Sequence, residues 1–289
     1  MCKVFVVGHS NPDMDSILSS MLLRDILLAQ GIVCECAVFE NDILSDEYVK
    51  IANEYGNYNP TIIKLEDVEK NKYFLVDHND ISSTIKNRNL VLGIIDHHKN
   101  DNWSELDENV LFTDRCSTTI SIFQLFKDEY KFSNKQKEQI MLGLAFDSKF
   151  GKSSQYELTD KLLAKELNIG KMPEDYFDAY FKESNLEPNK ILLNDRKPIT
   201  IGDKTYESCS LVTSNIDGLK LLCHAIENDT NDNFIGLISN IKSQTTTVII
   251  KENGDIKHLK HFDELYSRKN LQNDFKNFDN INLKNDLEI

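Results

Sequence analysis

The chain has 289 residues, of which 40% are hydrophobic and 28% are charged, with only 11 Gly and 5 Pro. This balance excludes collagen-like, low-complexity and disordered chains, and the length allows two globular domains. The formal net charge of -14 excludes a surface that binds nucleic acid through many phosphate contacts, so no nucleic-acid partner is expected.

The sequence also bears on the compartment. No apolar run approaches the roughly 18 residues that a membrane-spanning helix needs, so no membrane partner is expected. Met1 leads into a short strand-like run rather than into a signal peptide. The six cysteines are scattered and indicate neither a disulfide framework nor a zinc ribbon. These features predict a cytoplasmic protein.

The N-terminal part alternates apolar runs with helical patterns. A β-branched run over residues 3–8 predicts a first strand, and a helical pattern follows over residues 16–30. Further strands are predicted at residues 32–39, 73–76 and 90–95. Continuous apolar strands separated by helices are typical of a parallel sheet covered on both faces, so this part is predicted to be an α/β domain.

Three helical patterns continue the first domain, at residues 118–129, 134–145 and 159–167. A polar passage containing Pro188 follows, and we place the linker there, at residues 185–194. The linker separates a first domain over residues 1–184 from a second domain over residues 195–289.

The second domain is predicted to be smaller and of mixed α/β type. Its strand patterns lie at residues 199–213, 234–240 and 245–251, and a helical pattern lies near residues 216–227. The last twenty residues are polar and show no clear periodicity.

Acidic residues and histidines fall where the predicted strands end. Residues 8–16 (GHSNPDMDS) follow the first strand, Asp77 and His78 end the third, and the triplet at residues 96–98 (DHH) ends the fourth. Asp147 closes another apolar run. Because ligands bind beyond the carboxyl ends of parallel strands, these clusters should converge on one crevice. A ligand set of carboxylates and imidazoles without thiolates suits Mn, Mg or Co. The number of candidate ligands allows two metal ions.

Each residue taken alone has a simpler interpretation. A single Asp or His in a loop is more often a helix cap, a turn residue or a solvated side chain than a metal ligand. Asp13, for example, also fits a cap of the following helix. The convergence of four clusters favours a metal site, whereas His224, His258 and His261 lack such a context and are expected to be solvated or core histidines.

Taken together, the motifs resemble the DHH phosphoesterase superfamily, and within it the manganese-dependent (family II) inorganic pyrophosphatases. The likeness rests on residues 8–17 (GHSNPDMDSI), 76–79 (VDHN) and 96–98 (DHH). It continues in chain order through Arg115-Cys116-Ser117-Thr118, Asp147-Ser148, Lys152-Ser153, Asp195-Arg196-Lys197 and Ser267-Arg268-Lys269. The resemblance implies an N-terminal parallel-sheet DHH domain, a smaller mixed α/β C-terminal domain (DHHA2-like) and an active site in the cleft between them.

The resemblance also implies the site residues. One metal would be bound by His9, Asp13 and Asp77. A second would be bound by Asp15, Asp77, His97 and Asp147, so that Asp77 bridges the two. His98 would be the catalytic residue that contacts substrate, and phosphate would be bound by Lys197, Arg268 and Lys269.

The implied reaction is hydrolysis of inorganic pyrophosphate to two phosphates by a metal-activated water. The implied cofactors are two Mn²⁺ (or Co²⁺) per chain, with Mg²⁺ carried by the substrate. The partner is a small-molecule phosphoanhydride, and the resemblance allows a homodimer. Departures from the family pattern border the predicted substrate pocket, at residues 149–151 and 270–274, and leave substrate length open.

Three alternatives remain. An exopolyphosphatase of the same superfamily would use the same metals. The oligonucleotide-cleaving, RecJ-like branch would carry a Gly-Gly-x-His motif in its second domain, which this sequence lacks. A non-catalytic scaffold would have no reason to retain all six candidate ligands.

Overall fold

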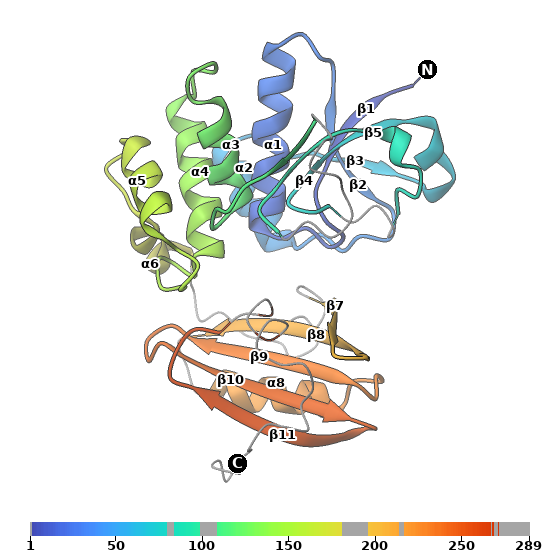
Figure 1. Ribbon diagram of the computed structural model, residues 1–289, viewed down its shortest axis with the longest axis vertical. Coiled ribbons are helices and arrows are strands. Elements are labelled where there is room, and N and C mark those ends of the chain that lie inside the picture. Colours follow the sequence, from blue (N-terminus) through green and yellow to red (C-terminus); the bar gives the residue numbers. More distant parts are fainter. Residues whose placement is uncertain are drawn as a thin grey trace. The chain divides into compact units, whose positions relative to one another are not determined.

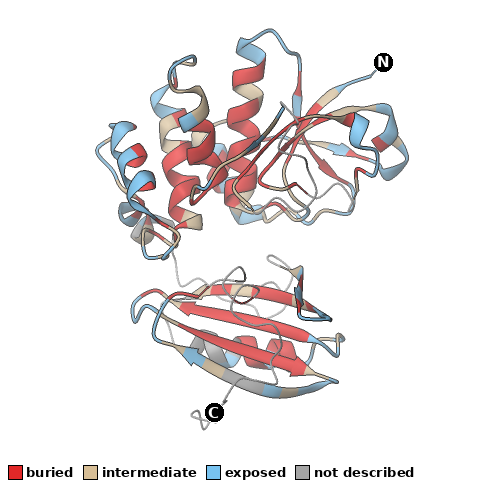
Figure 2. Ribbon diagram, in the orientation of Figure 1, coloured by how far each residue is buried: buried red, intermediate tan, exposed pale blue. Residues whose placement is uncertain are grey.

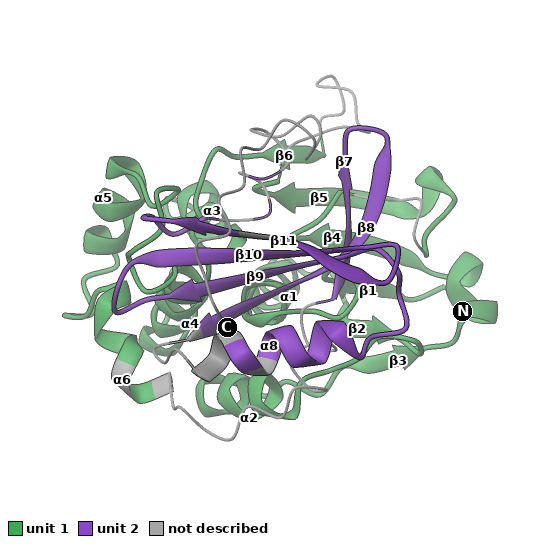
Figure 3. Ribbon diagram, turned by 90° about the horizontal axis from the view of Figure 1, so that it is seen from below, with its two compact units in different colours: residues 1–180 green, residues 181–289 purple. Residues whose placement is uncertain are grey.

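The structure is a computed structural model that describes residues 2–79, 84–98, 109–180, 196–213, 217–266, 268 and 271. Its contacts divide the chain into two compact units, Met1–Tyr180 and Phe181–Ile289, which Figure 3 colours separately. The predicted linker, residues 185–194, lies outside the described residues. The exact domain boundaries therefore stay a prediction.

The first unit is built on a parallel six-stranded sheet with the strand order β3-β2-β1-β4-β5-β6. The strands are β1 (Val4–Val7), β2 (Glu35–Phe39), β3 (Thr61–Ile63), β4 (Lys72–Val76), β5 (Val91–Asp96) and β6 (Val110–Phe112). From β1 the chain adds β2 and β3 on one side of the sheet. It then returns to the other side of β1 and adds β4, β5 and β6 there. Such a reversal opens a crevice at the carboxyl ends of the two central strands, which is where ligands bind in sheets of this kind.

Six α-helices accompany this sheet within the described part of the first unit. They are α1 (Met14–Ala29), α2 (Asp46–Tyr55), α3 (Thr118–Phe126), α4 (Asn134–Asp147), α5 (Leu158–Glu166) and α6 (Phe177–Tyr180). Short 3-10 turns are η1 (Leu65–Lys70), η2 (Arg88–Leu90) and η3 (Pro173–Tyr176). Helix α1 lies between the sheet and the pair α3 and α4 (Figure 1). It is buried over most of its length (Figure 2), which explains why its sequence is apolar on nearly every side.

The second unit holds a five-stranded mixed sheet with the order β11-β10-β9-β8-β7. Its elements are β7 (Lys197–Ile201), β8 (Lys204–Thr213), α8 (Asp217–Glu227), β9 (Phe234–Asn240), β10 (Thr245–Glu252) and β11 (Asp255–Phe262). Strands β8 and β9 are parallel and α8 connects them, whereas the other neighbours are antiparallel. Leu222 and Ile226 of α8 pack on one face of this sheet. Tyr266 and Leu271 pack with a second apolar cluster of the same sheet.

The expected fold class is confirmed: a parallel α/β unit precedes a smaller mixed unit. The run at residues 199–213 is not one strand, because Gly202 (φ +61°) turns the chain between β7 and β8. Strand β11 was not predicted from the sequence. Five cysteines are buried and Cys2 is exposed. No helix in the described ranges is long and apolar enough to cross a membrane.

Candidate metal centre

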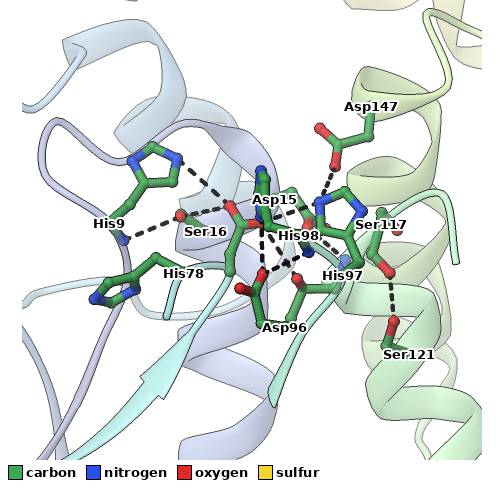
Figure 4. Close-up of polar contacts among 12 residues, drawn as sticks. His9, Asp15, Ser16, His78, Asp96, His97, His98, Ser117, Ser121 and Asp147 are labelled. Atoms are coloured by element: carbon green, nitrogen blue, oxygen red, sulfur yellow. Dashed lines mark hydrogen bonds and ion pairs between the residues drawn. The ribbon is translucent and has the colours of Figure 1, made fainter. Parts of the chain in front are cut away.

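The elements of the first unit bring seven predicted site side chains to the carboxyl edge of its sheet. Four of these residues follow strands directly or through the loop after β1, one lies in the first turn of α1, one caps that helix, and one ends α4. Figure 4 labels His9, Asp15, His97, His98 and Asp147 among them. The seven are His9, Asp13, Asp15, Asp77, His97, His98 and Asp147. The convergence expected from the strand ends is therefore present, and the role of each residue as a ligand stays a prediction.

The first group of possible ligands is His9, Asp13 and Asp77, whose ligand atoms lie within 4.8 Å of one another. Nε2 of His9 lies 3.2 Å from Oδ2 of Asp13 and 3.5 Å from Oδ2 of Asp77. Asp13 also caps α1, because its side chain accepts a hydrogen bond from the Ser16 N–H at 3.1 Å. The cap and the metal-ligand interpretations of Asp13 are thus compatible.

The second group comprises Asp15, Asp77, His97 and Asp147, again within 4.8 Å of one another. Nε2 of His97 lies 3.3 Å from Oδ1 of Asp77 and 3.5 Å from Oδ2 of Asp147. Asp15 is fully buried and accepts the N–H groups of Thr118 and Thr119 at the start of α3, at 2.6 and 3.0 Å. Burial and the neighbouring Asp77 carboxylate raise the pKa of Asp15 to about 7.

Asp77 belongs to both groups, and its two oxygens face different histidines. Oδ2 faces His9 and Oδ1 faces His97. The hydroxyl of Ser16 donates to Oδ2 at 2.7 Å, and that of Thr118 donates to Oδ1 at 3.2 Å. Asp77 has a left-handed backbone (φ +61°), a conformation that Asp tolerates better than most residues. A carboxylate placed in this way can bridge two ions.

The hydrogen bonds of two imidazoles determine which ring nitrogen is available. Nδ1 of His9 lies 2.8 Å from the Ser10 carbonyl, and Nδ1 of His97 lies 3.1 Å from the Arg115 carbonyl. A carbonyl only accepts, so both Nδ1 atoms carry the proton and both Nε2 atoms present a lone pair to the carboxylates. This arrangement is the usual state of a metal-binding histidine.

His98 is in a different environment. Its Nδ1 lies 2.8 Å from Oδ1 of the buried Asp96, whose other oxygen accepts from the side chain of Asn79 at 2.8 Å. Burial alone would raise the pKa of Asp96, but the hydrogen bond and charge of His98 and the charge of His97 hold it well below its usual range. The His98 side chain is 37% exposed, against 5% for His97. His98 also lies close enough to Asp77 and His97 to form a third possible ligand group.

The predicted phosphate-binding residues belong to the second unit. Lys197 begins β7, and its carbonyl accepts the Ser208 hydroxyl at 2.7 Å. Arg268 is partly buried and lies between the buried Tyr266 and Leu271 in the sequence. Lys269 lies outside the described residues.

Several supporting residues were not predicted from the sequence. Asp96 is the first residue of the DHH triplet and Ser117 is a typical N-cap before α3, but the sequence alone did not assign either of them a supporting role. The pairing of Thr118 and Thr119 with Asp15 left no local signal, because these residues are more than 100 positions apart.

The donor set fits divalent metal ions that accept both oxygen and imidazole nitrogen. The two groups offer four carboxylates and two lone-pair Nε2 atoms and no thiolate. Asp15 and Asp77 are nearly fully buried side by side, an arrangement whose repulsion a dication would offset. The residues of this chain therefore hold a divalent metal cofactor.

Comparison with known proteins agrees with this chemistry. The model of the DHH family N-terminal domain matches residues 3–146. A protein of Bacillus subtilis (strain 168) named manganese-dependent inorganic pyrophosphatase is 27% identical over 233 residues, which cover 76% of this chain and 74% of the relative. A protein of Shouchella clausii (strain KSM-K16) named "Probable manganese-dependent inorganic pyrophosphatase" is 24% identical over 268 residues, 86% of each chain.

Among solved structures, the fold is similar to that of a Methanococcus jannaschii protein titled "putative family II inorganic pyrophosphatase". The TM-score is 0.74 at 21% identity, and the match covers 95% of this chain and 100% of that chain. At this identity the likeness shows a shared fold over nearly the whole chain.

Proposed function

The N-terminal half of the chain is a DHH family domain, and from this premise we propose that the protein hydrolyses inorganic pyrophosphate to two phosphates with manganese as its metal. The observation that carries the proposal is the pair of ligand groups that share Asp77. The names of the relatives and the shared fold support the same reaction.

We propose that two ions bind, one in each group. The two ions together would lower the pKa of a bound water and stabilise charge on the phosphate oxygens. His9 and His97 contribute Nε2, because backbone carbonyls hold the proton on Nδ1. Asp77 would contribute to both groups, because its Oδ2 faces His9 and its Oδ1 faces His97. Mn²⁺ or Co²⁺ suits this mixture of oxygen and nitrogen ligands, and Mg²⁺ would arrive with the substrate.

His98 is proposed as the residue that donates to a phosphate oxygen. Asp96 holds the proton of the His98 ring on Nδ1, and a protonated ring then donates from Nε2. The charge of Asp96 stabilises the protonated ring in the same way that a buried carboxylate supports other catalytic histidines. Lys197, Arg268 and Lys269 are proposed to bind phosphate, Arg268 in a bidentate manner.

The resemblance also supports a homodimer as a proposal. Light scattering after size-exclusion chromatography measures the mass of the particle and tests it directly.

The reaction is tested by phosphate release from pyrophosphate, tripolyphosphate, long-chain polyphosphate and short oligonucleotides, each with Mn²⁺ and with Mg²⁺. We expect the highest kcat/KM for pyrophosphate with Mn²⁺. Faster release from tripolyphosphate would instead indicate an exopolyphosphatase, and release from oligonucleotides would indicate the nucleic-acid branch. No release from any substrate would indicate a non-catalytic protein. An Asp77→Ala variant serves as the control for contaminating phosphatase.

A further inference from the structure

A short segment that leads into the first turn of α3, residues 115–119, contacts three of the four members of the second ligand group. The Arg115 carbonyl accepts from Nδ1 of His97 at 3.1 Å. The N–H groups of Thr118 and Thr119 donate to Asp15, and the Thr118 hydroxyl donates to Asp77. The position of this segment therefore determines where these three side chains lie.

Asp160 of α5 holds this segment from the other side. Its side chain is 1% exposed, and Oδ1 accepts the Cys116 N–H at 3.2 Å. Oδ2 accepts the Glu157 N–H at 3.0 Å, which completes the capping box at the start of α5. One carboxylate thus ties α5 to residues 115–119.

Charge reinforces this connection. Nη1 of Arg115 lies 3.8 Å from Oδ1 of Asp160. Nε and Nη1 of Arg115 are buried and have no hydrogen-bond partner among the described residues. Asp160 therefore provides negative charge beside a poorly satisfied buried guanidinium. Removal of that charge would leave Arg115 uncompensated and favour a shift of the segment.

The first ligand group is held differently. His9 is positioned by the Ser10 carbonyl and by the Ser16 hydroxyl, and Asp13 accepts the Ser16 N–H. These contacts lie within the loop after β1 and the first turn of α1. Asp77 is the member common to both groups.

We propose that Asp160 is a positioning residue for the second ligand group and acts through residues 115–119 on His97 and Asp15. The inference rests on the proposed two-ion centre and goes beyond it, because it assigns the affinity of one ion to a residue that binds neither. Outer partners of metal-binding histidines commonly change metal affinity by about 10–100-fold. Asp160 acts across one further peptide group, so we expect the lower end of that range.

The test measures the affinity of metal-free protein for Mn²⁺. The electron paramagnetic resonance signal of free Mn²⁺ reports how much of the ion remains unbound. Chains with Asp160 and with Asp160→Asn are compared in two backgrounds, Asp13→Ala and Asp147→Ala, each of which removes one carboxylate from one group and leaves the other group complete. In the Asp13→Ala background, where the second group remains, Asp160→Asn should weaken Mn²⁺ binding about 10-fold. In the Asp147→Ala background, where the first group is complete, it should weaken binding much less, because only Asp77 of that group contacts residues 115–119.

Leu163→Ala is the matched control, because Leu163 is a buried residue of the same helix and its loss loosens α5 while Asp160 stays intact. It should bind Mn²⁺ as the unmodified protein does, with folding followed by circular dichroism. Equal weakening by Leu163→Ala, or equal effects of Asp160→Asn in both backgrounds, would overturn the proposal.

Asp160→Glu keeps the charge and the capping box of α5 and moves the carboxylate by one methylene. We expect intermediate Mn²⁺ affinity, and this variant carries the test if Asp160→Asn does not fold. Unchanged affinity in Asp160→Glu would then overturn the proposal. Failure of the unmodified protein to bind Mn²⁺ would instead contradict the metal centre itself.

Discussion

At the scale of single residues, two adjacent histidines differ because their Nδ1 atoms have different partners. Nδ1 of His97 donates to a backbone carbonyl, and its Nε2 faces Asp77 and Asp147. Nδ1 of His98 faces the carboxylate of Asp96, and the side chain is far more exposed. The first environment suits a neutral metal ligand and the second suits a group that exchanges a proton with substrate.

His98→Gln should therefore retain bound Mn²⁺ and lose about 10²–10⁴-fold in kcat, which is the usual contribution of a proton-transfer group. His97→Gln should lose Mn²⁺ from the second ligand group. Metal content after dialysis and steady-state kinetics check both variants. Equal loss of Mn²⁺ in the two would mean that His98 is a ligand, as the third grouping with Asp77 and His97 allows.

The residues that the sequence could reveal are the candidate metal ligands, since they lie in motifs at strand ends. Asp13, Asp77 and His97 belong to this class. Asp160 could not be found in this way, because it contacts Cys116 across 44 positions and its local pattern indicates only a helix start. Residues that hold ligands in place are recognised only when the chain is folded.

At the scale of elements, the second ligand group depends on close packing of α3 and α4 around Asp15. Gly143 of α4 leaves no room for a side chain: a Cβ there would lie 2.5 Å from Oγ1 of Thr119 and 2.8 Å from Oδ1 of Asp15. The absence of a side chain at this position thus lets Asp15, a predicted metal ligand, lie between the helices.

Gly143→Ala should lower the free energy of unfolding by about 1–3 kcal/mol, because overpacking outweighs the better helix propensity of Ala. It should also weaken Mn²⁺ binding to the second group. Gly170→Ala is the control: it has a left-handed backbone (φ +73°) with no atom near the new Cβ, so backbone strain alone destabilises it. Thermal unfolding and Mn²⁺ titration separate the two effects. Unchanged Mn²⁺ affinity in Gly143→Ala would contradict the packing argument.

Elements with long apolar runs were predicted well, among them α1, α4 and β9. Strands β3 and β6 have three residues each, which is too short for a pattern of apolar residues to be recognised in the sequence. The segment after Asp147 also had no clear signal. Lys149, Phe150 and Gly151 all have positive φ, and this left-handed turn follows the end of α4 at Asp147, its predicted ligand.

At the scale of the whole molecule, the second unit carries the cations proposed to bind phosphate in a chain of net charge -14. Long-range repulsion of pyrophosphate makes short-range cations important. The unusual sequence after Lys269 still contains an apolar anchor, since Leu271 is buried with Tyr266 in the second unit. The sequence showed this departure but could not show that Leu271 packs into a core.

Lys197→Ala, Arg268→Lys and Lys269→Ala should each raise KM or lower kcat while both ions remain bound. Arg268→Lys is not conservative, because an ammonium cannot reproduce the two parallel hydrogen bonds of a guanidinium. Kinetics measured beside metal content check this. Unaltered kinetics in all three variants would mean that these residues of the second unit do not bind the substrate.

Manganese-dependent hydrolysis of pyrophosphate is tested by measuring phosphate release after a chelator has removed the metal and then during titration with Mn²⁺. Activity should be absent without metal and should recover as two Mn²⁺ bind per chain, because the shared Asp77 couples the two ligand groups. Full hydrolysis in excess chelator, or no hydrolysis at saturating Mn²⁺, would contradict it.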